Sequence, residues 1–266
     1  MLASWRAVNV AAFGLNTLVT YTVGTGSVGK LIGAKSNREI SEEYRVLITP
    51  AGWAFAIWGP IFLLEGVAVY RQYQSAEHMW SNRTSQAWCA ACVLQSAWTF
   101  AFSYEYFATS TLLISGIAAS VGVAYQSMPA SFNLTELLFD GGFVFGLHAA
   151  WLIAATVINA NITVEASGAA SPSALVSLAT ASELLAAGAT AALTLAFRDP
   201  TFAAVGAWAL NAIRSKLEAE RSPPQGFTES NVVRVASIAR ASSAALLVVG
   251  GGVLCWRLAQ ELRVVN

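Results

Sequence analysis

The chain has 266 residues, of which 56% are hydrophobic and only 11% are charged, and its mean hydropathy is +0.55. Soluble domains carry about 25% charged residues, so this composition excludes an ordinary soluble enzyme. The 15 basic residues are matched by 15 acidic ones, which leaves no positive field to attract nucleic acid. The charges gather in short clusters between long uncharged stretches, and the sequence therefore predicts an integral membrane protein with several spans.

A transmembrane helix needs about 20 apolar residues, and eight stretches meet or approach this length. In chain order the predicted spans are 7–29, 46–64, 84–104, 106–135, 141–164, 174–197, 200–213 and 237–258. Seven spans are the alternative if 200–213 only dips into the interface. Long blocks of Leu, Ala, Val and Phe are typical of helices rather than barrel strands. The predicted fold class is therefore all-α, a polytopic membrane helix bundle.

A stretch of small residues at 165–173 is the best candidate for a boundary inside the membrane region. We therefore predict a five-helix membrane core over 1–164 and a C-terminal extension of about three helices over 165–266. The extension contains a polar loop at 214–236, where a Pro-Pro-Gln-Gly run indicates a loop.

Three segments carry specific aromatic patterns. The segment around the second span reads Tyr44-x-x-Leu47-x-x-Pro50-Ala51-Gly52-Trp53 and then Phe55-x-x-Trp58-x-x-Ile61-Phe62-x-x-x-Gly66-x-Ala68. The third and fifth spans contain Gln95-x-x-Trp98-Thr99-x-x-Phe102 and Trp151-x-x-x-Ala155-x-x-Ile158-Asn159. Together, and in this order, they resemble the translocator protein or tryptophan-rich sensory protein (TspO) family. The resemblance covers about residues 7–161 and looks closest to a longer branch with extra C-terminal helices.

The resemblance implies a five-helix core and a tryptophan-lined cavity that takes a flat hydrophobic ligand by stacking and burial of apolar area. The ligand-binding residues it implies are Trp53, Trp58, Phe62, Gln95, Trp98, His148, Trp151 and Asn159. This sequence departs from the family pattern at several of the positions near the pocket. Gln95 stands where the family has Asn, Leu147-His148 replaces a Pro-Tyr pair, and Glu65 replaces an apolar residue.

Three ionisable residues within the spans are candidate pigment or proton sites, because such groups are costly in the bilayer and normally face the protein interior. His148 lies in mid-span, where a neutral imidazole is either an axial ligand to a tetrapyrrole metal or hydrogen-bonded to a neighbouring helix. Glu65 lies six residues before Arg71, which favours a position near the interface. Glu183 lies nearer the middle of its span.

Two functions are consistent with these features. The first is a TspO-like receptor or carrier that binds a tetrapyrrole- or sterol-like ligand. The alternative is a structural or pigment-binding accessory subunit of a large membrane complex, such as a photosystem supercomplex. We expect no enzymatic activity and no metal site of protein ligands alone, because the sequence shows no nucleophile–base set, paired-carboxylate motif or zinc-ligand set.

The cofactors considered are porphyrin, chlorophyll, carotenoid and lipid. The expected partners are membrane lipid, a hydrophobic small molecule and, under the alternative, other membrane-protein subunits, with no nucleic acid. The thylakoid, the mitochondrial membranes and the bacterial inner membrane are all consistent with the sequence.

Overall fold

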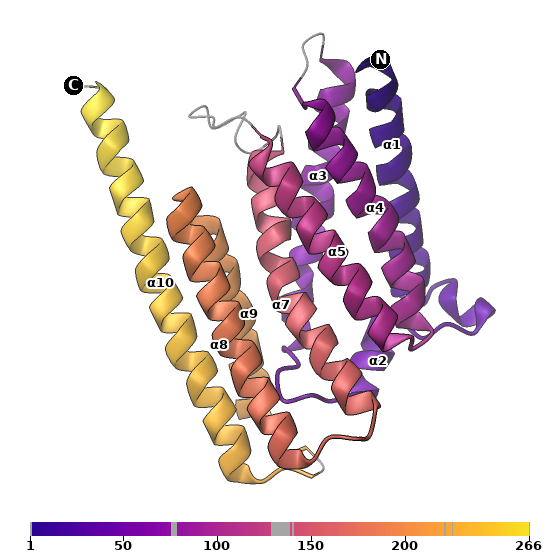
Figure 1. Ribbon diagram of the computed structural model, residues 1–266, viewed down its shortest axis with the longest axis vertical. Helices are drawn as coiled ribbons and strands as arrows, with labels where there is room; N and C mark the ends of the chain where they lie inside the picture. The colour runs from indigo at the N-terminus through magenta and orange to yellow at the C-terminus, as the bar shows by residue number, and fades with distance from the viewer. Residues whose placement is uncertain are drawn as a thin grey trace. The chain divides into compact units, whose positions relative to one another are not determined.

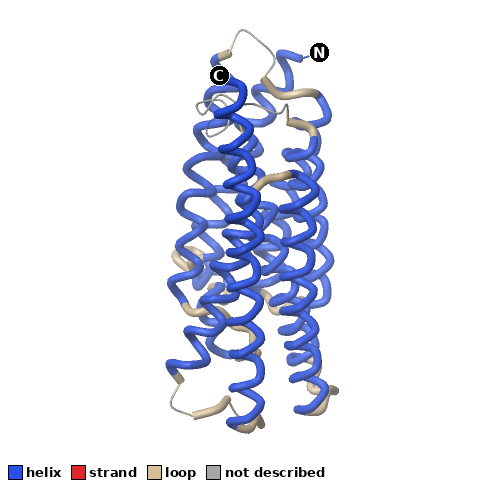
Figure 2. Tube along the Cα trace, turned by 90° about the vertical axis from the view of Figure 1, so that its left-hand side faces the viewer, coloured by secondary structure: helices blue, strands red, loops and turns tan. Residues whose placement is uncertain are grey.

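The computed structural model describes residues 2–75, 79–128, 139, 141–220, 222–224 and 226–265. The regular elements of these residues are all helices (Figures 1 and 2). The chain divides into two compact units. The N-terminal unit comprises Met1–Tyr44 and Ala56–Leu152, and the C-terminal unit comprises Arg45–Phe55 and Ile153–Asn266.

The N-terminal unit is built around α4, which packs along both α1 and α5, while α1 also packs on α3. Its long helices are α1 (Leu2–Val19), α3 (Trp58–Gln74), α4 (Asn82–Ser103), α5 (Phe107–Gln126) and the first part of α7 (Gly142–Ala166) (Figure 1). α1 continues into a π-helical turn, Thr20–Gly24. The hydroxyl of Ser81 accepts a hydrogen bond from the backbone N–H of Thr84, and this N-cap fixes where α4 begins.

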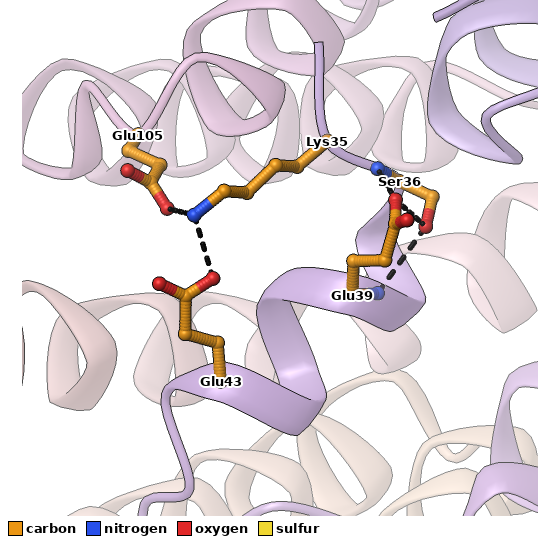
Figure 3. A network of polar contacts seen from close by, with 5 residues as sticks. All are labelled: Lys35, Ser36, Glu39, Glu43 and Glu105. Atoms are coloured by element: carbon orange, nitrogen blue, oxygen red, sulfur yellow. Dashed lines mark hydrogen bonds and ion pairs between the residues drawn. The ribbon is translucent and has the colours of Figure 1, made fainter. Parts of the chain in front are cut away.

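The loop after α1 contains the short helix α2 (Asn37–Glu43), and polar contacts hold it against the turn between α4 and α5. Lys35 Nζ lies 2.6 Å from a carboxylate oxygen of Glu43 and 2.5 Å from one of Glu105, as Figure 3 shows. Ser36 and Glu39 form a capping box at the start of α2. The Glu105 and Glu43 carboxylates raise the pKa of the Lys35 ammonium above its usual range.

The C-terminal unit packs three helices closely: α8 (Pro172–Phe197), α9 (Pro200–Ala219) and α10 (Glu229–Val265). α8 and α9 both begin with a proline in the first turn, after caps from Ser171 and Asp199. Gly206 explains how α9 reaches both neighbours. A Cβ atom there would lie 2.9 Å from Leu246 on α10 and 2.9 Å from Thr190 on α8.

The segment Arg45–Phe55 belongs to the C-terminal unit, although it lies early in the sequence. The backbone N–H of Ala51 donates to the carbonyl of Ala212 on α9 at 3.0 Å. The indole N–H of Trp208, also on α9, donates to the carbonyl of Ala54 at 3.2 Å. Two hydrogen bonds from α9 therefore fix the backbone on either side of Trp53.

The predicted all-helical membrane bundle is confirmed, since a long described helix overlaps each of the eight predicted spans. Five helical segments are long and apolar enough to cross a membrane: Gly52–Gln74, Phe107–Gln126, Gly142–Ala166, Pro172–Phe197 and Glu229–Gln260. α1, α4 and α9 are the remaining three long helices. The span predicted at 106–135 is described as far as residue 128, and its remainder lies outside the described residues.

The bounds of the second span were predicted wrongly. The helix runs over Trp58–Gln74 after a 3-10 turn at Gly52–Ile57, whereas the sequence predicted 46–64. The prediction ended the span at the first charge, Glu65. The helix continues through Glu65 because that side chain is buried and paired inside the unit.

Candidate functional site

A buried acid–imidazole pair joins α3 and α7 in the N-terminal unit. Glu65 Oε1 and His148 Nδ1 lie 2.7 Å apart, and each side chain is only 1% exposed. The sequence placed Glu65 near the interface, and this is corrected: the carboxylate lies inside the helix bundle. His148 is hydrogen-bonded to a neighbouring helix, as one of its two alternatives expected. The sequence marked each residue separately as a candidate pigment or proton site. Nothing in it indicated that two residues 83 positions apart would form a pair.

Aromatic rings surround this pair. The ring of Trp58 meets the imidazole of His148 nearly edge-on, with centroids 5.4 Å apart and an interplanar angle of 78°. It also contacts Trp151 at 6.4 Å and Phe62 at 5.9 Å. Helix periodicity explains the arrangement, because residues three, four or seven positions apart share one face of a helix. Trp58, Phe62 and Glu65 therefore line one face of α3, and His148 and Trp151 line one face of α7.

Two polar atoms of the pair have no hydrogen-bond partner among the described residues. They are Glu65 Oε2 and His148 Nε2, and both are buried. When the carboxylate is ionised it can only accept, so a neutral His148 carries its hydrogen on Nδ1. In that form Nε2 keeps a lone pair that nothing in the described structure uses.

The aromatic cluster extends through side chains that the sequence did not single out. Phe13 on α1 contacts Phe62 at 6.4 Å and stacks on Trp88 of α4, also at 6.4 Å. Trp88 in turn contacts Trp80 and Phe145. The high tryptophan content was the only signal for these residues, because their positions match no segment of the predicted pattern.

Gln95 and Trp98 lie on α4 in the same unit, with different neighbours. The side-chain oxygen of Gln95 accepts a hydrogen bond from Asn16 of α1 at 3.3 Å. Trp98 is half-buried and stacks on Phe102, with centroids 5.1 Å apart. These contacts tie Gln95 to α1 and Trp98 to the next turn of its own helix.

Trp53, Asn159 and Glu183 belong to the C-terminal unit, whereas the cluster around Trp58 belongs to the N-terminal unit. Trp53 is 42% exposed and packs against Trp208, with ring centroids 4.6 Å apart. Asn159 is buried on α7. Glu183 is 2% exposed, and neither carboxylate oxygen has a hydrogen-bond partner in the described part of the chain.

A second polar group lies between α1, α3 and α4. The amide nitrogen of Asn9 donates to Gln72 at 3.1 Å and to Ser85 at 3.2 Å, and the thiol of Cys89 donates to the Asn9 oxygen. A small cleft borders it, lined by Trp5, Arg6, Gln72, Met79, Trp80, Asn82 and Ser85. Its volume of about 10 Å³ suits a single water molecule.

The family model for TSPO-like proteins matches residues 6–250. The chain belongs to the TSPO-like protein family. The predicted TspO resemblance is thus confirmed, and the match continues beyond residue 161 through α8, α9 and most of α10. Searches of curated proteins and of solved structures returned no match to the chain.

This TSPO-like chain is an integral membrane protein, as both the family and the five apolar segments indicate. Among its described residues, no group of three or more His, Cys, Asp or Glu side chains could hold a metal ion. The aromatic cluster therefore offers ring stacking and apolar burial. It also offers one polar pair in which His148 Nε2 and Glu65 Oε2 have no hydrogen-bond partner among the described residues.

Proposed function

We propose that this TSPO-like membrane protein binds a flat hydrophobic ligand, of the tetrapyrrole or sterol class, at the aromatic cluster of Trp58, Phe62, His148 and Trp151. The observation that supports the proposal is the position of Trp58. Its ring contacts the other three residues while its side chain is still half-buried rather than enclosed.

Flat rings gain most by lying against aromatic faces, and such contacts contribute about 0.5–1.5 kcal/mol beyond the area they bury. The other three members of the cluster are nearly enclosed, with Trp151 1%, His148 1% and Phe62 6% exposed. Trp58 is thus the member through which a ligand dissolved in the lipid reaches the cluster.

The backbone next to Trp58 leaves room for this approach. Gly59 is exposed, and a Cβ atom added there would meet nothing within 4 Å. Pro60, the next residue, is also exposed and compact. Few atoms therefore cover the exposed surface beside Trp58, which favours the approach of a ligand from the side of the helix.

The test is quenching of tryptophan fluorescence by metal-free protoporphyrin IX, measured on the full chain in detergent. Trp58→Ala is expected to weaken binding about tenfold, the equivalent of one lost stacking contact. Trp256→Ala is the matched control, because Trp256 is 41% exposed and lies in the C-terminal unit. Cholesterol competition then separates a tetrapyrrole preference from a sterol preference.

The same dissociation constant in the Trp58 variant and the wild type would contradict the proposal, as would equal losses in the variant and its control. The accessory-subunit alternative and the absence of enzymatic activity both stay predictions, because the family match addresses neither partners nor catalysis.

A further inference from the structure

We propose that the small cleft beside Asn9 is a second binding site, which takes one oxygen atom of a phosphate group. The side chains that hold the oxygen are Gln72, Ser85 and Arg6, which all line the cleft. None of them belongs to the aromatic cluster of Trp58, and the inference does not depend on the proposed function.

The cleft lies at one end of the N-terminal unit. Arg6 is near the start of α1, Gln72 is in the last turn of α3, and Ser85 is in the first turn of α4. These three helix ends lie together in Figure 1. Trp5 also lines the cleft, and tryptophan and arginine are typical of the boundary between membrane and water. The phosphates of lipid headgroups lie at the same boundary.

Gln72 and Ser85 offer hydrogen-bond donors to the cleft. Their acceptor atoms are used by Asn9, whose amide nitrogen donates to Gln72 Oε1 at 3.1 Å and to Ser85 Oγ at 3.2 Å. The amide nitrogen of Gln72 and the hydroxyl hydrogen of Ser85 have no acceptor among the described residues. Both side chains are buried, at 4% and 1% exposed. Because buried donors normally have an acceptor, the atom that binds between them is an acceptor such as oxygen.

The charges around the cleft favour an anion over a neutral acceptor. Arg6 is half-buried, and it is the only charged side chain among the described residues that line the cleft. Asn82 and Ser85 bring the first turn of α4 to the cleft, where the backbone N–H groups and the helix dipole attract negative charge. Arginine and a helix N-terminus are the groups with which proteins bind phosphate.

The size of the cleft sets how much of the ligand enters it. A volume of about 10 Å³ holds one oxygen atom, in the place of one water molecule. A phosphate group puts one oxygen against Gln72 and Ser85 and keeps the others beside Arg6 and exposed Asn82. A lipid headgroup and inorganic phosphate share this chemistry, and the experiment distinguishes them.

The experiment titrates the full chain in a neutral detergent with dioleoyl phosphatidic acid and counts bound lipids by native mass spectrometry. The reference lipid is dioleoylglycerol, which has the same acyl chains and no phosphate. The wild type is expected to bind one phosphatidic acid about tenfold more tightly than dioleoylglycerol, since hydrogen bonds to a charged group are the stronger ones.

Gln72→Glu is the main variant. The new carboxylate still accepts the hydrogen bond from Asn9, but a negative oxygen replaces the donor that faces the phosphate. The tenfold preference for phosphatidic acid is expected to disappear. Gln74→Glu is the matched control, because it adds the same charge to the same helix end at an exposed residue that does not line the cleft. It is expected to keep the preference.

Arg6→Gln tests the site a second way, without a new charge in the interior, and covers the case in which Gln72→Glu does not fold. It is expected to weaken the binding of phosphatidic acid about fivefold and to leave that of dioleoylglycerol unchanged.

Phosphorus NMR of inorganic phosphate added to the protein identifies the source. A lipid preference without broadening of the phosphate signal assigns the site to a lipid headgroup. Broadening that Arg6→Gln reduces assigns it to phosphate from the water.

A wild type that neither distinguishes the two lipids nor broadens the phosphate signal would overturn the inference. The same preference in the wild type and in both cleft variants would also overturn it. Equal losses in Gln72→Glu and Gln74→Glu would do so as well, because they would show that only the general surface charge matters.

Discussion

Hydrogen-bonding side chains lie between the helices of the N-terminal unit and, at Asn161 and Ser182, of the C-terminal unit, which also brings its helices together over small residues. In the first, Asn9 joins Gln72 and Ser85, Asn16 joins Gln95, and Glu65 joins His148. In the second, half of the buried residues of α9 are alanine or glycine, namely Ala203, Gly206, Ala207, Ala209 and Ala212.

Polar pairs and small residues between helices have different consequences for ligand binding. Polar pairs between helices fix which helices meet and leave defined chemistry inside the bundle. Small residues let helices approach closely, and they offer a ligand no group to contact. The proposed binding cluster lies in the N-terminal unit, beside the Glu65–His148 pair, and the C-terminal unit supplies the α9 surface that anchors Arg45–Phe55.

The largest expected effect tests the polar pair. His148→Leu leaves the buried Glu65 carboxylate without its partner and is expected to lower the free energy of unfolding by about 3 kcal/mol. Adding Glu65→Leu to the same chain is expected to restore most of the loss, because no buried polar group then remains. Thermal unfolding in detergent measures both. A double variant as unstable as the single one would show that Glu65 and His148 are not coupled.

The close packing of the C-terminal unit predicts the next effect. Gly206→Ala puts a methyl group 2.9 Å from both Leu246 and Thr190, so the free energy of unfolding is expected to fall by about 1–2 kcal/mol. Gly188→Ala on α8 is the matched control. A Cβ there meets nothing within 4 Å, and alanine favours a helix over glycine by about 1 kcal/mol. Equal melting temperatures for the two variants would contradict the close contact.

Replacing Glu183 in the C-terminal unit gives a stability effect that can be compared with that of replacing His148 in the N-terminal unit. Its carboxylate is buried without a hydrogen-bond partner among the described residues, so Glu183→Leu is expected to raise the free energy of unfolding by about 1 kcal/mol. The opposite sign is expected for His148→Leu in the other unit. A loss of stability on replacing Glu183 would mean that this carboxylate has a stabilising partner, such as a bound ligand.

The smallest effect concerns the loop after α1 and depends on pH. The backbone N–H and hydroxyl of Ser36 lower the pKa of Glu39 below its ordinary value of 4.5. This carboxylate therefore stabilises the fold above about pH 4.5, and the contribution is lost as the pH falls through the lowered pKa. Ser36→Ala is expected to cost about 0.5 kcal/mol at pH 7 and less at pH 3. A difference in melting temperature that is constant between these pH values would contradict the assignment.

Much of the local structure follows from nearby residues. The sequence predicted a span beginning at residue 200, and the structure begins α9 there, with Asp199 as the cap and Pro200 in the first turn. The long apolar stretches predicted the helices because, in lipid, a chain must satisfy its own backbone hydrogen bonds. The wrong bounds of α3 have the opposite cause. Counting charges treated Glu65 as an end, and only its distant partner makes it an interior residue.

The sequence by itself determined the membrane class, the helical fold and the family, since these depend on composition, period and short motifs. Only the tertiary structure decided that Glu65 meets His148 and that Arg45–Phe55 is bound by α9. The physical reason is that both depend on contacts between residues far apart in the chain. The Trp208–Ala54 hydrogen bond, for example, spans 154 positions, and no local preference of either residue indicates which distant helix it will meet.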